Sequence, residues 1–237
     1  MSTSALIFAA GLGTRLRPLT DSRPKALVEY EGKTLLEHVL DKIIAAGIHD
    51  IVVNVHHFPD QIIDFLKAHP KDARVRVSDE RAYLRDTAGG LKFASPLLTN
   101  SDHVLLHNVD ILSSIDLAKL VEHHITSGAD ATLAVRDRQT ARYLLFDPED
   151  LSLCGWRNVQ TGEEILSRDL PNALPLAFSG IHVVNRKVIN NLPSVEKSSI
   201  VPFYVQKAGE LSIQGYWHQE DDWLDVGKYK DFCNILK

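Results

Sequence analysis

The sequence contains few cysteines and no long apolar run. Cys154 and Cys233 are the only cysteines in 237 residues, which is too few for a disulfide framework or a zinc site, so we interpret both as free thiols. No apolar stretch approaches the roughly 20 residues that a membrane helix needs, and the N-terminus lacks the basic and then apolar pattern of a signal peptide. The sequence therefore predicts a cytoplasmic protein without a membrane segment.

A surplus of basic residues is also absent. The formal net charge is -5 at pH 7, whereas proteins that bind nucleic acids or anionic membranes usually carry an excess of lysine and arginine. We therefore expect neither nucleic acid nor a membrane among the partners. Hydrophobic residues make up 44% of the chain, which is enough for a substantial core.

What the sequence does contain is a regular alternation of strand-like and helical patterns over its first 139 residues. Strand and helix in strict turn predict an α/β domain with a mostly parallel sheet. The strand patterns cover residues 4–10, 50–56, 73–79, 103–110 and 129–137, and the helical patterns cover residues 34–47, 59–69, 89–98 and 115–128.

The pattern changes after about residue 140. Three short strand-like runs are followed by a buried strand at 177–185, a helix at 199–209, a strand at 211–218 and a closing helix at 227–237. The chain has no fixed-period repeat and no low-complexity linker. It therefore reads as one domain over residues 1–237 with a small β-rich insertion.

The segment AAGLGTRLRPLTDSRPK (9–25) directly follows the first predicted strand. A loop in this position lies at the carboxyl edge of a parallel sheet, where α/β folds bind their ligands. Gly11 and Gly13 have no side chains, so their backbone N–H groups can approach an anion closely. Arg15 and Lys25 add positive charge. The loop therefore has the features of a polyphosphate site.

Two better-known phosphate loops do not fit this sequence. The dinucleotide-binding fingerprint requires a third glycine where the chain has Leu16. The GKT segment at 32–34 resembles the end of a P-loop, but the first glycine of that motif would fall at Leu27.

The segment GLGTRLRPLTDSRPKAL (11–27) resembles the signature loop of the sugar-1-phosphate nucleotidyltransferases. The agreement covers the glycines together with Thr14, Arg15, Pro24 and Lys25, in both type and spacing. The resemblance implies an NTP and a sugar 1-phosphate as substrates and Mg²⁺ as cofactor. It also implies a three-layer α/β/α Rossmann-like fold with a mixed, mostly parallel sheet and a small β-rich sugar-binding insertion.

The same resemblance assigns roles to particular residues. It implies that Arg15 and Lys25 are catalytic, that residues 1–139 form the nucleotide-binding half, and that residues 140–237 form the sugar-binding half with the closing metal element. Lys25 also binds the sugar phosphate on this reading. The implied nucleotide contacts are Ala10, Gly11, Gly13, Thr14, Arg15, Thr87, Gly89 and Gly90. Glu80 and Arg81 come just before Thr87 in the sequence, so their side chains could reach the nucleobase.

Two aspartates and one small-residue step complete the implied site. Asp110 ends the strand VLLHNVD, and Asp225 in WLDVG matches the second metal-binding aspartate of the family. Ser179 and Gly180 match a strand against which the sugar packs. From the residues alone, Asp110 can equally be a turn or helix-capping residue. The step at 179–180 can equally be a glycine kink in a buried strand.

The eleven histidines do not suggest a metal site. His56 and His57 are adjacent, as are His123 and His124, and neighbours on a strand or helix point in different directions. We therefore interpret these four as edge or surface residues.

Several functions remain open at this stage. Among family branches, the compact length and the segments DTAGG and AFSGIHV most resemble the N-acetylmuramic acid 1-phosphate uridylyltransferases, followed by mannose- and heptose-phosphate guanylyltransferases. A non-catalytic nucleotide-sugar sensor is a second possibility, although such proteins usually lose the loop or the metal aspartates. An NAD-dependent oxidoreductase is a third, and the missing third glycine argues against it. Monomer and homodimer are both compatible with the sequence.

Overall fold

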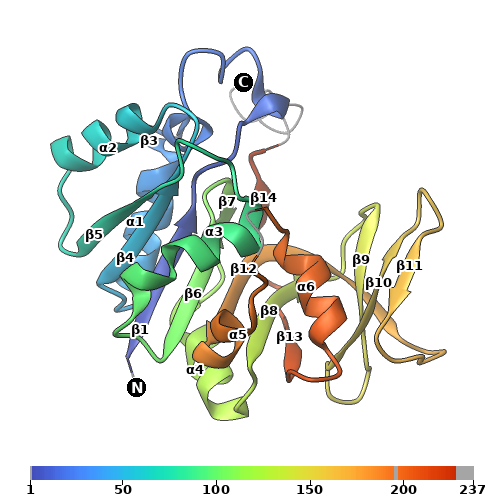
Figure 1. Cartoon of the computed structure of the whole chain (residues 1–237). Coiled ribbons are helices and arrows are strands. Elements are labelled where there is room, and N and C mark those ends of the chain that lie inside the picture. The colour runs from blue at the N-terminus through green and yellow to red at the C-terminus, as the bar shows by residue number, and fades with distance from the viewer. Residues whose placement is uncertain (1, 195–196, 228–237) are drawn as a thin grey trace.

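The computed structural model describes residues 2–194 and 197–227. Its main feature is a ten-stranded mixed sheet in the order β11-β10-β9-β12-β6-β1-β4-β5, with β8 and β13 joined alongside β12 (Figure 1). These strands are β1 (Thr3–Phe8), β4 (Asp50–Val55), β5 (Arg74–Asp79), β6 (His103–Asn108), β8 (Ala131–Arg136), β9 (Arg142–Phe146), β10 (Leu153–Asn158), β11 (Glu164–Leu166), β12 (Leu174–Asn185) and β13 (Ile213–Trp217). Two small ribbons pair β2 (Glu29–Tyr30) with β3 (Lys33–Thr34) and β7 (Ile111–Ser113) with β14 (Trp223–Asp225).

Helices cover both faces of the main sheet. Residues of α1, α2 and α4 contribute to one hydrophobic cluster, and residues of α3, α5 and α6 to the other. This gives three layers and confirms the predicted α/β/α fold with a mixed sheet. The helices are α1 (Leu35–Ala45), α2 (Pro59–Ala68), α3 (Asp86–Ala94), α4 (Leu117–Ser127), α5 (Arg186–Asn191) and α6 (Ile200–Lys207).

The central strands are buried on both sides, as their unbroken apolar sequences predict. In β1, Ala5 and Ile7 belong to the cluster with α1, whereas Leu6 belongs to the cluster with α3. This alternation follows from the two-residue period of a strand. Helix α1 begins with a capping box, in which Thr34 and Glu37 exchange side-chain and backbone hydrogen bonds.

The strand order places a topological switch point at β1. Strand β4 pairs in parallel with one edge of β1, and β6 pairs in parallel with the other. The connections from the carboxyl ends of β1 and β6 therefore diverge, which leaves a crevice at that edge of the sheet. The glycine loop follows β1, and Asp110 follows β6 by two residues.

The predicted β-rich insertion is the outer part of the sheet, made of β9, β10 and β11 (Figure 1). Strand β12 connects the two parts. Its first residues pair with β9, its later ones pair with β6 and β8, and its register with β8 shifts between Phe178 and His182.

Three details differ from the predictions or fall outside them. The predicted helix 89–98 begins earlier, at Asp86, and ends at Ala94, followed by a 3-10 turn over Ser95–Leu98. The ring of Pro96 cannot continue an α-helical hydrogen-bond ladder, which explains the change. The predicted closing helix lies outside the described residues except for Gly227, and so does Cys233. Cys154 is buried and free, as expected.

The interpretation of His124 as a surface residue is wrong. Its side chain is completely buried, with Nδ1 2.9 Å from Thr132 Oγ1 and Nε2 3.1 Å from His103 Nδ1. His124 lies on the inward face of α4, whereas His123 on the same helix is exposed. The helical pattern around it, with Leu117 and Leu120 buried, could have indicated this position.

Four buried histidines make the free energy of unfolding depend on pH. Burial lowers the pKa of His107, His124 and His218 to about 4 and that of His182 to about 3. Between these values and the ordinary pKa near 6.5, the unfolded chain binds protons that the folded chain does not, so the folded state loses stability as pH falls. Each such histidine lowers the free energy of unfolding by about 2 kcal/mol at pH 5 relative to pH 7.

Urea unfolding at several pH values between 7 and 5 measures this effect. His182→Phe removes one of the buried bases, so its free energy of unfolding should fall less steeply with pH than that of the wild type. Equal slopes for the two proteins would contradict the role assigned to His182.

No helix in residues 2–194 and 197–227 is both long enough and apolar enough to cross a membrane.

Candidate active site

The glycine loop turns sharply at Gly13. This residue has φ 64° and begins a 3-10 turn over Thr14–Leu16, whose Leu16 N–H donates to the Gly13 carbonyl at 2.9 Å. A Cβ atom at position 13 would lie 2.9 Å from Thr20 Cγ2 and 3.1 Å from Lys25 Cβ. Both the positive φ and the close packing therefore require glycine here.

The start of the loop is anchored by a side chain that the sequence analysis missed. The Asn54 side chain, on β4, accepts hydrogen bonds from the backbone N–H groups of Ala9 (2.7 Å) and Ala10 (3.2 Å). Its amide group donates to Glu80 Oε1 at 2.9 Å, and Asn54 is 2% exposed. The Ala10 N–H, a predicted nucleotide contact, thus already has a partner within the chain.

Lys25 and Asp110 form an ion pair across the crevice. Lys25 Nζ lies 2.6 Å from Asp110 Oδ2, and the two side chains are 15% and 18% exposed. A Cβ atom at Gly11 would lie 3.7 Å from the same Nζ, so the backbone of Gly11 also faces the ammonium group. The loop after β1 and the end of β6 therefore converge on one cation and one carboxylate.

Asp225 reaches the same place through the ribbon of β7 and β14. In this ribbon Asp225 pairs with Ile111, the residue after Asp110, and the Val226 N–H donates to the Asp110 carbonyl at 2.9 Å. A Cβ atom at Gly227 would lie 2.6 Å from Asp110 Oδ2 and 2.7 Å from Asp225 Oδ1. The two predicted metal-binding carboxylates therefore lie together, both next to the space that a side chain at residue 227 would need.

The loop and these side chains surround a small polar cavity of about 220 Å³. Its lining residues are Gly13, Thr14, Arg15, Lys25, Asp110 and Gly227. Five of these six were predicted site residues, and the lining as a whole comes from segments more than 200 residues apart, from Gly13 to Gly227. The backbone of a glycine turn together with Arg15 and Lys25 provides the donors that a polyphosphate needs.

The donor set at Asp110 and Asp225 fits magnesium. Mg²⁺ is commonly held by one or two carboxylates, with water and substrate phosphate oxygens completing its coordination. No group of three or more histidine, cysteine, aspartate or glutamate side chains that could hold a metal occurs among the described residues. Two carboxylates beside a phosphate-binding loop are what a substrate-completed Mg²⁺ site requires.

The predicted nucleotide contacts at the start of α3 have structural partners. Thr87 Oγ1 accepts a hydrogen bond from the Ile200 N–H at 2.9 Å, and the Gly89 N–H donates to the Ser198 carbonyl at 3.2 Å. A Cβ atom at Gly90 would lie 3.0 Å from both Asn54 Nδ2 and Glu80 Oε1. These residues therefore join α3 to α6 and to the anchor of the glycine loop.

Glu80 and Arg81 differ in their surroundings. Glu80 is 2% exposed, and burial raises the pKa of its carboxyl group. Arg81 lies at the surface, where it pairs with Asp60 and Asp79 at 2.8 Å each. Of the two, only Glu80 contacts Asn54, which anchors the glycine loop.

The step at residues 178–180 is held from three sides. Arg138 Nη2 donates to the Phe178 carbonyl at 3.2 Å, and Trp223 Nε1 donates to the Ser179 carbonyl at 2.9 Å. Gly180 has φ 77°, and a Cβ atom there would lie 2.8 Å from Asn108 Nδ2. This part of β12 therefore packs directly against the end of β6, next to the carboxylate site.

Ser179, His218 and Asp221 lie in the order of a hydrolase triad. Ser179 Oγ is 2.7 Å from His218 Nε2, and His218 Nδ1 is 3.7 Å from Asp221 Oδ2. The Ser179 side chain is completely buried, so no substrate can reach it as a nucleophile. The contact instead fixes the strand, and any sugar contact at Ser179 would use its backbone.

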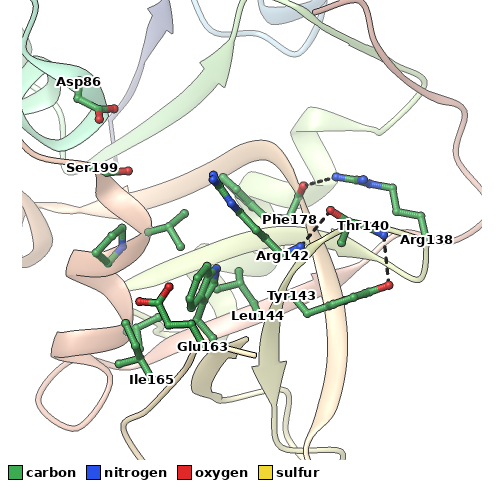
Figure 2. A pocket seen from close by; sticks show the side chains of 14 residues that line it. Asp86, Arg138, Thr140, Arg142, Tyr143, Leu144, Glu163, Ile165, Phe178 and Ser199 are labelled. Atoms are coloured by element: carbon green, nitrogen blue, oxygen red, sulfur yellow. Dashed lines mark hydrogen bonds between the residues drawn. The ribbon is translucent and has the colours of Figure 1, made fainter. Parts of the chain in front are cut away.

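A larger cavity of about 600 Å³ lies between the outer strands, β12 and α6 (Figure 2). Aromatic and aliphatic side chains form much of its wall, including Tyr143, Trp156 and Phe178. Arg138 and Arg142 also line it. The Arg138 guanidinium stacks on Trp223 at 4.3 Å from the ring centroid, which places this end of the cavity beside β14 and its Asp225. The sequence analysis named neither arginine.

Solved structures of other proteins share this fold. HddC from Yersinia pseudotuberculosis, complexed with GMP-PN, superposes with a TM-score of 0.75 over 100% of both chains at 20% identity. A putative glucose-1-phosphate thymidylyltransferase from Bacillus anthracis gives a TM-score of 0.80 over 99% of this chain and 94% of that chain at 16% identity. At these identities the likeness shows the fold alone.

Comparison of sequences finds relatives of higher identity than these structures. The chain is 33% identical to the N-acetylmuramate alpha-1-phosphate uridylyltransferase of Caulobacter vibrioides, over 94% of this chain and 91% of the relative. It is 31% identical to the mannose-1-phosphate guanyltransferase of Pichia angusta, over 97% of this chain but only 62% of that protein's length. The family model "Nucleotidyl transferase" matches residues 4–150. This chain therefore belongs to the nucleotidyl transferase family of enzymes.

Proposed function

We propose that this protein transfers a nucleotidyl group from an NTP to a sugar 1-phosphate, giving a nucleotide sugar and pyrophosphate. The observation that carries the proposal is a polar cavity lined by the glycine loop, Lys25 and Asp110, with the Asp225 carboxylate beside Asp110 at Gly227. These are the groups needed to bring two phosphate-bearing reactants together.

The reaction requires positioning more than proton transfer. A phosphate monoester has a second pKa of about 6, so the attacking oxygen of the sugar 1-phosphate is already an anion near neutral pH. The barrier arises from bringing this anion in line with the α-phosphorus of the NTP. Catalysis therefore depends on fixed positive charge and on orientation.

The glycine loop, Arg15, Lys25 and the two aspartates each have a place in this scheme. The backbone N–H groups from Gly11 to Thr14 cradle the triphosphate, and Arg15 holds the departing β- and γ-phosphates. Lys25 bridges the α-phosphate and the incoming sugar phosphate, for which it must exchange its contact with Asp110. Asp110 and Asp225 hold Mg²⁺, which supplies charge neutralisation at the phosphates when bound.

Each half of the chain is assigned one of the two substrates. We assign the NTP to residues 1–139, with Thr87, Gly89 and Gly90 beside its nucleoside, and the sugar to residues 140–237. The large cavity of Figure 2 is the place for the sugar, because residues 178–180 connect it to the carboxylates. Ser179 and Gly180 then offer their backbone to the sugar.

The relatives indicate which substrates to test first. The Caulobacter uridylyltransferase matches over nearly its full length, so we propose UTP and N-acetylmuramate 1-phosphate as the pair. The guanyltransferases are matched over a smaller share of their length and support GTP with mannose 1-phosphate as the second candidate. Both share the same phosphate chemistry.

Pyrophosphate release from the purified protein tests the proposal. We expect release with UTP and N-acetylmuramate 1-phosphate in the presence of Mg²⁺, and at least about tenfold less with each of the other three NTPs, because base-reading hydrogen bonds discriminate by at least that factor. Preference for GTP and mannose 1-phosphate would favour the second candidate. Binding of a nucleotide sugar without pyrophosphate release from any pair would identify a non-catalytic sensor instead.

A further inference from the structure

The outer part of the sheet, made of β9 to β11 and the residues just after β11, contains three arginines with different surroundings. Arg157 pairs with Glu164 at 2.9 Å, and Arg168 pairs with Asp147 at 2.8 Å, so each has a carboxylate partner at the surface. Arg142, on β9, lines the large cavity and forms no ion pair with any residue in the described part of the chain. In Figure 2 its side chain extends from β9 across the cavity.

The two carboxylates of the same cavity do not neutralise Arg142. Asp86 has its Oδ1 engaged with the Thr87 N–H at 2.7 Å, at the start of α3. Glu163 also lines the cavity, and neither it nor Asp86 forms an ion pair with Arg142 among the described residues. Arg142 is itself exposed, so its guanidinium group stands at the open side of this partly apolar cavity, without a carboxylate partner among the described residues.

A second cation lies at the inner end of this cavity. Arg138 is held by Trp223 and by the Phe178 carbonyl, and its Nε is buried without a hydrogen-bond partner among the described residues. Guanidinium groups bind carboxylates with paired N–H donors, and such charge-assisted bonds are stronger than neutral ones. The sugar phosphate itself is expected at Lys25, outside this cavity. Any anion bound here must therefore be a second one on the acceptor.

The geometry points to an acceptor sugar that carries a carboxylate, with Arg142 as the residue that selects it and Arg138 as the neighbouring cation. This inference rests on the proposed function, and it assigns recognition of the acceptor's acidic substituent to these two residues. N-acetylmuramate 1-phosphate has such a group in its lactyl ether. N-acetylglucosamine 1-phosphate has the same ring and acetamido group without the carboxylate, so it is the matched neutral probe.

The test compares Arg142→Gln with the wild type on both acceptors. Loss of one charge-assisted contact should raise the KM for N-acetylmuramate 1-phosphate at least about tenfold. The KM for N-acetylglucosamine 1-phosphate and for UTP should stay within about twofold, since neither has a carboxylate that meets Arg142. Arg142→Lys keeps the charge and should recover part of the loss. Arg157→Gln removes a surface arginine of the same sheet and should change none of these values.

Two results would overturn the inference: equal changes in KM for the two acceptors in Arg142→Gln, or a wild-type protein that uses the neutral sugar as well as the acidic one. Absence of turnover with every sugar 1-phosphate would instead contradict the proposed function. In that case the inference is tested by calorimetry, which compares how tightly each of the two acceptors binds to the wild type and to Arg142→Gln. A selective loss of the acidic ligand supports it, and no selective loss overturns it.

Discussion

Replacing Lys25 by alanine should lower kcat at least about 100-fold, the usual loss when one charge partner of a transition state is removed. In the free protein the Lys25 ammonium lies 2.6 Å from Asp110, at the centre of the cavity where the two phosphates are proposed to meet. Without it, the attacking and accepting phosphate groups repel each other, and Asp110 loses its counterion. Steady-state pyrophosphate release at saturating UTP and acceptor measures the effect.

The control for this experiment is a lysine of the same half with a comparable partner. Lys33→Ala breaks an exposed contact of 2.8 Å between β3 and Asp41 of α1 and should leave kcat unchanged. Thermal unfolding of both variants separates loss of catalysis from loss of fold. A Lys25→Ala protein that folds and keeps kcat within tenfold of the wild type would refute the assignment of Lys25.

Asp225→Asn should abolish most activity through the metal. The substitution preserves size, and its side-chain oxygen can still accept the Gly227 N–H that Asp225 Oδ1 accepts at 2.9 Å. It removes one of the two charges that are proposed to hold Mg²⁺, so kcat should fall at least about 100-fold and half-saturation by Mg²⁺ should shift upward at least about tenfold. Pyrophosphate release as a function of Mg²⁺ concentration measures both changes.

Asp222 provides the matched control in the same segment. Its side chain is exposed, and Asp222→Asn makes the same chemical change three residues before Asp225. Its Mg²⁺ dependence should match that of the wild type. An unshifted Mg²⁺ dependence in Asp225→Asn would show that this carboxylate does not bind the metal.

The parts of the site that the sequence predicted are those governed by local pattern and topology. Gly11 and Gly13 follow an unbroken apolar run, and Asp110 ends another, so the rule that ligands bind at the carboxyl ends of parallel strands places all three at one edge. The structure brings Asp225 to the same point through the pairing of β14 with β7. That pairing cannot be derived from spacing, and only the family resemblance pointed to it.

The parts that were missed depend on contacts between distant segments. Asn54 and Glu80 are separated by 26 residues and meet only because β4 and β5 are adjacent in the sheet. Arg138 and Trp223 stack across a still longer separation. A polar residue at a strand end carries no local sign of its partner. The sequence therefore indicated a buried strand at β4 without revealing that its asparagine anchors the glycine loop.

His124 shows a different kind of failure. Its adjacent histidine indicates only that the two side chains point in different directions, whereas the buried Leu117 and Leu120 of the same helix indicate which of the two faces the core. This apolar stripe is the better guide, because packing of an amphipathic face decides burial.

The glycine at position 227 has a consequence beyond its turn. The methyl group of an alanine at this position would lie 2.6 Å from Asp110 Oδ2 and 2.7 Å from Asp225 Oδ1, closer than van der Waals contact allows. The absence of a side chain at residue 227 therefore leaves room for the two carboxylates to lie together. Any larger residue would push the two carboxylates apart, so the room for the proposed ion between them depends on a position that carries no functional group.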